Sequence, residues 1–488
     1  MEKTPEYLSH RLDKLKALAA EGINPYPYNF DKSHGTTEII AKFDELSAGA
    51  AIVKVAGRVL SLRGHGKTLF AHIGDSEGKI QIYARRDDLG GAFGLFDKLD
   101  IGDFIGIEGT VFRTKTEEIT IRVQKAVMLA KSLRPLPEKW HGLQDKELRY
   151  RRRYLDLIAN PEVKALFKRR AQIVKEVRSF LDERGFIEVE TPVLQPLYGG
   201  AAARPFVTHH NALDFDLYLR IADELYLKRL IIGGFEKVYE MAKDFRNEGM
   251  DKHHNPEFTM LEFYWAYADY NDLMGLLEEM FRQLAINIAG STRLPFGEHT
   301  IDFDKPFARV SYFEAITEAC GHQIIELEED QLATLAAKLD IDSEGLQGRG
   351  DYFDAFFSHF VEPHLIQPTF LKDFPVELSP LAKVHRDNPR LAERFELFIA
   401  GFEFGNAFSE LNDPQDQRRR MEQQAALIKR GHQEAQPVDE DFIFALEHGM
   451  PPTAGYGLGI DRLVMLLTNS QSIRDIILFP TMKPEEQS

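Results

Sequence analysis

The 488-residue chain has a single cysteine, Cys320, which excludes an intramolecular disulfide and a cysteine-rich zinc site. It also lacks any apolar run approaching the ~20 residues that a membrane-spanning helix requires. The first residues, MEKTPEYLSHRLDKLKAL, do not contain the apolar core of a secretory signal. Together these absences predict a cytoplasmic protein without a membrane partner.

Positive charge is also in short supply, because 60 lysine and arginine residues face 77 aspartate and glutamate residues, for a net charge of −17. This balance argues against a nonspecific basic coat for nucleic acid, although a local basic patch remains open. Arginines at positions 149 and 151–153 form one such cluster, which suits either a solvated helix or a phosphate contact. The length predicts roughly two to four domains.

The first 131 residues combine a helical start with a series of short strands. An N-terminal extension over residues 1–50 is expected to contain one helix. Alternating apolar residues and turn signals then predict strands at Ile52–Leu62, Thr68–Ile73, Lys79–Ala84, Phe104–Phe112 and Ile119–Leu129. With a helical piece between the third and fourth strands, this order is typical of an oligonucleotide-binding β-barrel, expected over residues 51–131.

The same alternation leaves a polar and aromatic face on this barrel. Phe70 and Gln81 lie opposite the apolar positions of their strands, and Glu118 does so at the start of the fifth. A phenylalanine beside an amide and a carboxylate suits base stacking and recognition of base edges. A single exposed phenylalanine is common on its own, so only the barrel context favours this interpretation.

The second half is one large region of mixed helices and strands. Residues 132–160 are expected to form a linker that contains several prolines. One large domain, expected to be the catalytic domain, follows over residues 161–488. A long helix at Pro161–Arg184 precedes the strand-like segment FIEVETPVL, which Pro192 interrupts. Residues from about 270 to 365 are mostly amphipathic helix and are expected to form an insertion.

The most informative segment spans Phe245 to Tyr267 and reads FRNEGMDKHHNPEFTMLEFYWAY. After a polar turn that ends at Asn255-Pro256, it becomes a strand whose alternate side chains share one face. The residues expected on that face are Phe258, Met260, Glu262 and Tyr264. A buried carboxylate there needs a partner, such as a cationic ligand. An edge strand with hydrated polar groups is the alternative.

A glycine-rich segment, GYGLGIDRLVMLLTN, covers residues 455–469. Its three glycines allow close approach of the backbone before an apolar helix that begins near Ile460. Arg462 falls in the first turn of this helix, where a cation opposes the helix dipole. An anionic ligand such as phosphate would resolve the conflict, and so would pairing with Asp461. The surroundings match neither a dinucleotide fingerprint nor a G-x-x-x-x-G-K-[ST] loop.

A third segment, RFELFIAGFEFGNAFSELND at residues 394–413, places Glu396, Glu403 and Glu410 among aromatic residues. Isolated carboxylates are costly in such surroundings. A hard divalent cation shared with nucleotide phosphates would stabilise them, and separate salt bridges would do so too. Strict alternation of side chains does not put Glu396 and Glu403 on one face of a strand. They would share a face only if the alternation is interrupted at Ala400-Gly401.

In this order, the helix with FIEVETPVL, the segment FRNEG…HNPEF and the segment GYGLGIDR resemble the three motifs of class II aminoacyl-tRNA synthetases. The barrel is similar to that of the aspartate, asparagine and lysine enzymes. The chain most resembles the bacterial-type lysyl-tRNA synthetases, in GGAAARPF, LRIADELYLKRL, MLEFYWAYADY, VELSPLAK and GNAFSELND. The resemblance implies an α+β fold: an antiparallel sheet flanked by helices, with an N-terminal OB-fold barrel.

The resemblance also implies the reaction. Such an enzyme joins L-lysine to ATP as lysyl-adenylate, releases pyrophosphate, and transfers lysine to the 3′ end of tRNA(Lys). Positioning, arginines and Mg²⁺ provide catalysis without a protein nucleophile. The implied catalytic residues are Arg246 and Arg462. The implied ATP-binding residues are Arg246, Glu248, His254, Asn255, Phe258, Glu396, Glu403 and Arg462, of which Glu396 and Glu403 also hold the metal.

For the amino acid, the resemblance implies a site made of Gly200, Glu224, Arg246, Glu262, Tyr264, Asn406, Phe408 and Glu410. Two ammonium groups call for carboxylates, and an alkyl stem calls for aromatic walls. An aspartate substrate would instead require a cation at its side chain. The implied anticodon-binding residues are Phe70, Gln81 and Glu118, and the first motif implies a homodimer.

Two alternatives differ in function. A related enzyme that attaches lysine-like groups to a protein would lack the anticodon barrel, which this sequence predicts. A noncatalytic regulator that binds tRNA would be expected to lose Arg246, Glu403 or Arg462, and all three are present.

Overall fold

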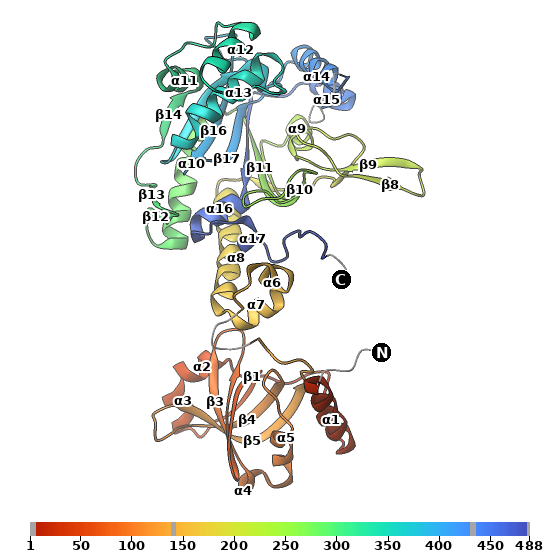
Figure 1. The fold of residues 1–488 in the computed structure, drawn as a ribbon, viewed down its shortest axis with the longest axis vertical. Helices are drawn as coiled ribbons and strands as arrows, with labels where there is room; N and C mark the ends of the chain where they lie inside the picture. Colours follow the sequence, from red (N-terminus) through yellow and green to blue (C-terminus); the bar gives the residue numbers. More distant parts are fainter. Residues whose placement is uncertain (1–5, 138–142, 430–435, 486–488) are drawn as a thin grey trace. The chain divides into compact units, whose positions relative to one another are not determined.

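The computed structural model describes residues 6–137, 143–429 and 436–485. It divides into two compact units, one formed by residues 1–145 with 154–160 and the other by residues 146–153 with 161–488 (Figure 1). No helix among the described residues is both long and apolar enough to cross a membrane.

The first unit is built around a closed five-stranded barrel, as predicted. In barrel order the strands are β1 (Ile52–His65), β2 (Thr68–Gly74), β3 (Lys79–Arg85), β5 (Ile119–Ala130) and β4 (Phe104–Arg113). Buried and half-buried residues alternate along β2 and β3, so every second side chain fills the interior. The parallel pairing of β3 with β5 closes the barrel.

Short helices surround this barrel. They are α1 (Glu6–Ala20), α2 (Thr36–Ala41), α3 (Phe43–Ala48), α4 (Arg86–Leu89) and α5 (Gly94–Asp97). The last two flank a 3₁₀ turn at Gly90–Phe93, between β3 and β4, where the sequence predicts a helical piece. Leu18, Ile39 and Phe96 extend the apolar core of the barrel into these helices.

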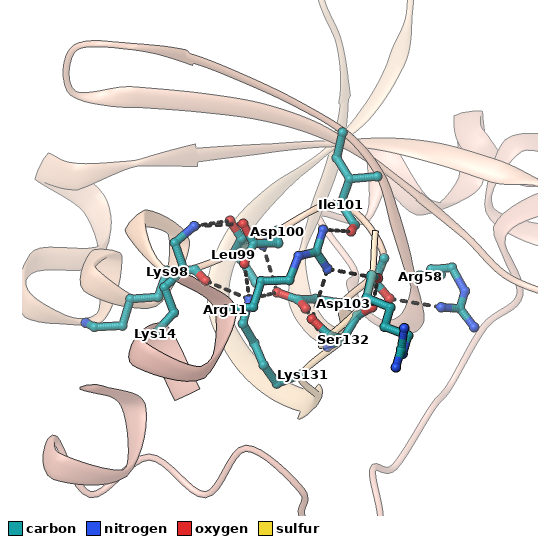
Figure 2. A network of polar contacts seen from close by, with 12 residues as sticks. Arg11, Lys14, Arg58, Lys98, Leu99, Asp100, Ile101, Asp103, Lys131 and Ser132 are labelled. Atoms are coloured by element: carbon teal, nitrogen blue, oxygen red, sulfur yellow. Dashed lines mark hydrogen bonds and ion pairs between the residues drawn. The ribbon is translucent and has the colours of Figure 1, made fainter. Parts of the chain in front are cut away.

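A polar network fixes α1 against the barrel (Figure 2). The ammonium group of Lys131, just past β5, is fully buried between Asp100 Oδ2 at 2.5 Å and Asp103 Oδ2 at 2.8 Å. From α1, Lys14 reaches Asp100 Oδ1 at 2.7 Å, and Arg11 donates to the backbone oxygen of Ser132 at 2.9 Å. These contacts attach the N-terminal helix to the loop between α5 and β4.

The second unit contains an eight-stranded, mainly antiparallel sheet. Its strands are, in order, β14 (Ala308–Ser311), β15 (Thr369–Pro375), β16 (Leu391–Ile399), β17 (Phe402–Ser409), β18 (Thr453–Gly459), β11 (Glu257–Ala266), β10 (Lys237–Phe245) and β6 (Ile187–Glu188). Only the two outer pairings, β14 with β15 and β10 with β6, are parallel. The α+β class predicted from the sequence is therefore confirmed.

Helices cover one face of this sheet. Apolar side chains of α8 (Pro161–Asp182), α10 (Tyr270–Leu284) and α16 (Ile460–Thr468) pack against those of β11, β16, β17 and β18 in the largest core of the molecule. Leu261 and Phe263 of β11 point into this core, so the residues that alternate with them point to the other face. That other face carries the candidate site.

The remaining elements surround the sheet. The segment FIEVETPVL forms only two short strands, because Pro192 separates β6 from β7 (Leu194–Gln195). The strand β7 joins β9 (Phe215–Leu219) and β8 (Val207–His210) in a small sheet. The other helices of this unit are α6 (Lys146–Arg151), α9 (Glu224–Ile232), α14 (Pro414–Lys429), α15 (Glu440–Glu447) and α17 (Ile473–Ile476). The helix α7 (Arg153–Ala159) belongs to the first unit apart from Arg153.

The stretch from residue 270 to 365 contains α10 and a second helical cluster with its own apolar core. The helices of this cluster are α11 (Tyr312–Cys320), α12 (Glu329–Lys338) and α13 (Gly348–Phe360). The stretch also includes β14 and a hairpin of β12 (Arg293–Phe296) and β13 (His299–Asp302). These strands have only four residues each, which is too short for periodicity to distinguish them from helix ends.

Candidate active site

The strand β11 forms the floor of a deep pocket in the second unit. Phe258, Met260, Glu262 and Tyr264 all line it, as their shared face predicts. The edge-strand alternative is wrong, because β11 lies between β10 and β18 with antiparallel pairing on both sides. The polar face of this strand therefore meets a cavity within the protein.

Every residue of this unit predicted to bind ATP, lysine or metal lines this same pocket. These residues are Gly200, Glu224, Arg246, Glu248, His254, Asn255, Phe258, Glu262, Tyr264, Glu396, Glu403, Asn406, Phe408, Glu410 and Arg462. They come from segments more than 250 residues apart in sequence, brought together by the central strands. Their individual roles stay predictions.

The glycine-rich segment is strand β18, followed directly by α16, whose start at Ile460 is as predicted. A Cβ atom at Gly455 would overlap both Glu410 and Tyr264. A Cβ atom at Gly405, on the neighbouring strand, would overlap Tyr456 and the backbone of Gly457. The absence of Cβ atoms at these glycines therefore allows the side chains of Glu410, Tyr264 and Tyr456 to pack directly against the sheet backbone.

Arg462 points into the pocket from the first turn of α16. Its Nη1 donates to the backbone oxygen of Glu403 and lies 3.7 Å from the Glu403 carboxylate, and its Nη2 is 3.4 Å from His254 Nε2. Asp461 is engaged elsewhere, at 2.6 Å from Arg170 Nη1 and as acceptor from Thr259 N at 2.8 Å. Asp461 is therefore not the anionic partner of Arg462 in this structure.

The turn between β16 and β17 explains how Glu396 and Glu403 reach one cavity. Ala400 and Gly401 have φ angles of 56° and 77°, and the pairing of the two strands slips by one residue next to Leu397. This irregularity resets the alternation, so both carboxylates line the pocket. Sequence parity alone did not contain this information.

Glu396 and Glu403 offer oxygen donors of the kind that Mg²⁺ prefers. Glu396 is ion-paired with Arg394, and Glu403 lies beside Arg462, so salt bridges also form. Burial raises the pKa of Glu396 to about 7, with Arg394 opposing and Glu403 reinforcing the shift. Two neighbouring carboxylates, one of them costly to ionise, are a donor set that fits a divalent cation.

Carboxylates also gather at the opposite end of the pocket. The hydroxyl of Tyr264 donates to Glu262 Oε2 at 3.2 Å. Burial raises the pKa of Glu262 well above its usual value and that of Glu410 to about 8. Sequence reasoning missed Lys228, whose Nζ lies 2.5 Å from Glu224 Oε1 and 2.5 Å from Glu410 Oε2. Its spacing of four residues from Glu224 in an apolar helix was the available signal.

A second missed cluster lies beside Glu262. Carboxylate oxygens of Asp223, Asp244 and Glu262 are within 4.8 Å of one another, and all three residues are buried. Arg220 compensates part of this charge, at 3.0 Å from Asp223 Oδ1, 3.4 Å from Asp244 Oδ1 and 2.7 Å from Glu240 Oε1. Burial raises the pKa of Asp223 to about 10, with Asp244 and Glu262 reinforcing the shift and Arg220 opposing it. Burial also raises the pKa of Asp244 to about 6, with Arg220 and Arg246 opposing the shift.

The remaining residues form the rim and wall between the two ends. The guanidinium of Arg246 lies 5.2 Å from the ring centre of Phe258. His254 is held by Asp251 at 2.9 Å. Asn255 donates to the backbone oxygen of Glu257 at 2.6 Å, so it shapes the turn before β11 as well as lining the pocket.

The barrel of the first unit carries a separate hollow, and Phe70 and Gln81 line it. Gln81 donates to Glu118 Oε2 at 2.7 Å, and Glu118 Oε1 lies 2.8 Å from His72 Nε2. Gln81 and Glu118 are thus hydrogen-bonded to one another, and Phe70 lines the same hollow as Gln81. Strand alternation also turns His72 and Tyr83 outward, but it does not reveal the aromatic row of Phe70, Tyr83 and Phe112, whose successive ring centres are 4.8 Å and 6.1 Å apart.

An antiparallel sheet with a pocket of arginines and carboxylates, together with an OB-fold barrel, defines a class II tRNA synthetase. Residues 145–483 match the family model described as tRNA synthetases class II (D, K and N), and residues 53–129 match the OB-fold nucleic acid binding domain.

Curated relatives specify the member of the class. The chain is 55% identical to a protein of Moorella thermoacetica over 100% of both chains, and 54% identical to one of Carboxydothermus hydrogenoformans over 99% of both. A protein of Methanoculleus marisnigri is 54% identical over 97% of this chain and 94% of its own. All three are named lysine–tRNA ligase, and the chain belongs to this family.

Proposed function

We propose that this protein is a lysine–tRNA ligase, which joins L-lysine to ATP as lysyl-adenylate with release of pyrophosphate and then transfers lysine to the 3′ end of tRNA(Lys). The observation that carries the proposal is the single pocket with arginines at one end and buried carboxylates at the other. The first end suits a polyphosphate, and the second suits an amino acid with two ammonium groups.

At the phosphate end, Arg246 and Arg462 are the catalytic cations. Arg246 bridges the lysine carboxylate and the α-phosphate, which brings the attacking and accepting groups together. Arg462 holds the γ-phosphate and favours departure of pyrophosphate. Phe258 stacks on adenine, and the residues that complete the ATP site are Glu248, His254 and Asn255. The contact between Arg246 and Phe258 supports this arrangement, because it places a base-stacking ring beside a phosphate-binding cation.

Glu396 and Glu403 would hold Mg²⁺ in this site. The chemistry that the ion would supply when bound is neutralisation of phosphate charge and stabilisation of the leaving pyrophosphate. The pKa of about 7 at Glu396 supports the assignment, since a nearby cation would stabilise its ionised form. Arg394, which is paired with Glu396, fixes the orientation of that carboxylate.

At the carboxylate end, Glu224 and the backbone at Gly200 receive the α-ammonium group. Glu410 and Tyr264 receive the ε-ammonium group, with Glu262 beside them. The Oε1 atom of Glu410 is buried and has no hydrogen-bond partner among the described residues, which supports its role as an acceptor for substrate. Asn406 and Phe408 form the wall along the alkyl stem.

The barrel binds the anticodon of tRNA(Lys) through Phe70, Gln81 and Glu118. Phe70 stacks on a base, and the linked amide and carboxylate of Gln81 and Glu118 recognise base edges. This barrel argues against the paralogue that modifies a protein, because tRNA is the substrate that needs such a surface. The presence of Arg246, Glu403 and Arg462 in one pocket argues against a noncatalytic regulator.

We also propose that the protein is a homodimer formed through its first motif. Apolar side chains are exposed along β6, β7, β8 and β9, which supports a partner surface there. They are Ile187, Val193, Leu194, Leu197, Val207, Leu213 and Phe215. A cytoplasmic location completes the proposal, because charging of tRNA requires access to the ATP and tRNA used in translation.

The test of the proposed function is ATP–pyrophosphate exchange with each standard amino acid in turn. Lysine should support exchange, whereas aspartate and asparagine should not. The carboxylates of the pocket would repel the aspartate side chain, and the neutral asparagine side chain would leave these carboxylates without a cationic partner. Exchange driven by aspartate, or no exchange with lysine, would overturn the proposal.

A further inference from the structure

Lys228 is a buried cation inside the pocket wall. It lies on α9, its side chain is fully buried, and its ammonium group is 2.5 Å from both Glu224 Oε1 and Glu410 Oε2. The ring of Phe442, on α15, closes the far side at 5.9 Å. An ammonium group without water must be matched by negative charge, which Glu224 supplies and Glu410 increases when it is ionised.

Both of these carboxylates also line the cavity. Each therefore faces the internal ammonium group on one side and the lysine site on the other. Glu410 Oε2 lies 2.5 Å from Lys228 Nζ as an ion pair, and neither oxygen of this carboxylate has a further hydrogen-bond partner among the described residues. In this geometry one internal cation, Lys228, orients the two carboxylates that line the proposed substrate site.

A count of charges supports the same conclusion. The proposed lysine site contains three carboxylates, Glu224, Glu262 and Glu410, while lysine brings only two ammonium groups to it. The substrate carboxylate is assigned to Arg246. Lys228 supplies a third positive charge for these three acids, while the neighbouring Asp223, Asp244 and Glu240 share Arg220.

We propose that Lys228 is a positioning residue for lysine binding: its ammonium group orients Glu224 and Glu410 and reduces the cost of ionising Glu410 as the substrate enters. This inference rests on the proposed function. It assigns specificity for a diammonium substrate to a residue that does not itself contact that substrate.

The groups around Glu410 decide the expected pH dependence. Lys228 favours its ionised form, while Glu224 on the same helix as Lys228 disfavours it. From β11, the Tyr264 hydroxyl and the Glu262 carboxyl face the same space. Without Lys228, burial and Glu224 would act on Glu410 unopposed, so a higher pH would be needed to ionise it.

The test compares Lys228→Met with wild type in lysine-dependent ATP–pyrophosphate exchange. The KM for lysine at neutral pH should rise about tenfold or more, since each unit of displacement in a controlling pKa is a factor of ten. The rise should diminish at alkaline pH, and the KM for ATP should stay within about twofold because the phosphate end is unchanged. A KM for lysine equal to that of wild type at every pH would overturn the inference.

Arg229→Met is the matched control. Arg229 is the next residue of α9 and also packs over Phe442, but its partners are Asp439 and Asp441 outside the pocket. This variant should leave the KM for lysine and its pH dependence unchanged. An equal effect of both substitutions would indicate a general disturbance of α9 and would contradict the inference.

A double variant keeps the test decisive if Lys228→Met alone does not fold. Lys228→Met with Glu410→Gln removes both members of one buried ion pair, so that only Glu224 loses its internal cation. Relative to Glu410→Gln alone, the KM for lysine should change by less than about threefold, because the α-ammonium group of bound lysine still pairs with Glu224 and the ionisation of Glu410 no longer contributes. A double variant that fails to fold, or that loses a further tenfold, would show a structural role instead. Absence of lysine-dependent exchange in wild type would instead refute the proposed function.

Discussion

At the scale of single residues, the proposed role of Glu410 turns a buried carboxylate that is costly to ionise into a group that selects a cationic substrate. It is fully buried, and burial raises the pKa of its carboxyl to about 8 despite the nearby Lys228. Only a ligand that brings its own positive charge offsets this cost. An amino acid with a neutral or acidic side chain would bring no positive charge to the Glu410 carboxylate. This missing charge discriminates against such a substrate more strongly than the shape of the pocket alone.

The substitution Glu410→Gln therefore tests the lysine end of the pocket. It preserves the shape and removes the charge that pairs with the ε-ammonium group, so lysine activation should fall by roughly 30-fold or more, the effect of about 2 kcal/mol or above for a buried charged partner. The affinity for ATP should be largely spared. Unchanged lysine-dependent pyrophosphate exchange would mean that Glu410 does not bind the substrate.

The same carboxyl predicts a pH dependence for the wild-type enzyme. With its pKa raised to about 8, Glu410 is mainly protonated in the free enzyme below that pH and ionised when it binds an ammonium group. A proton must then leave on binding, so the KM for lysine should fall as the pH rises through about 8 and level off above it. Titration of KM in exchange assays measures this, and Glu410→Gln should lack the transition. A KM for lysine that rises over this range in the wild-type enzyme would contradict the assignment.

At the scale of elements, much of the site was predictable because strand alternation is a local property. The face shared by Phe258, Met260, Glu262 and Tyr264 follows from period two alone, and the structure places it on the pocket floor. The start of α16 at Ile460 follows from the change from glycines to an apolar helical run. The five barrel strands follow from the same alternation and turn signals.

Other features depend on non-local pairing and were not predictable. The convergence of Glu396 and Glu403 requires the slipped register between β16 and β17. The role of Lys228 requires the contact between α9 and Glu410, which is 182 residues away in sequence by the numbering of the two positions. The aromatic row on the barrel requires knowledge that β2 pairs with β3, since Phe70 and Tyr83 are opposite one another there.

The barrel strand β2 provides a test of tRNA recognition. Phe70→Ala should reduce charging of tRNA(Lys) by about tenfold or more, since stacking on one base contributes roughly 1–3 kcal/mol. Adenylate formation should be unaffected, because the ATP pocket lies in the other unit. Tyr28→Ala, at a fully exposed tyrosine of the same unit, is the control and should change neither step. Equal losses in both steps for Phe70→Ala would refute the role of the barrel.

At the scale of the whole molecule, the fold separates two recognition tasks. In the proposed function, the sheet of the second unit selects ATP and the amino acid, and the barrel of the first selects the nucleic acid. The net charge of −17 is consistent with this division, because tRNA binding then depends on a local surface rather than on overall attraction. The proposed homodimer would give the exposed apolar residues near β7 and β8 a third task, which is assembly.

Introducing charge into that apolar surface tests the dimer. Leu194→Glu combined with Val207→Glu should convert the protein to a monomer in sedimentation or light scattering, because like charges would be buried in the interface. Phe444→Glu, at a similarly exposed apolar residue on α15, is the control and should leave the assembly unchanged. A wild-type protein that sediments as a monomer would refute the homodimer directly.

The most direct measurement of the central claim is charging of tRNA in a complete reaction. The purified protein, ATP, Mg²⁺ and each radiolabelled amino acid are incubated with unfractionated tRNA, and the acid-precipitable product is quantified. Labelled lysine should appear on tRNA(Lys), with aspartate and asparagine at background. Transfer of either of those amino acids, or lysine-dependent ATP consumption with no lysine on tRNA, would contradict the claim.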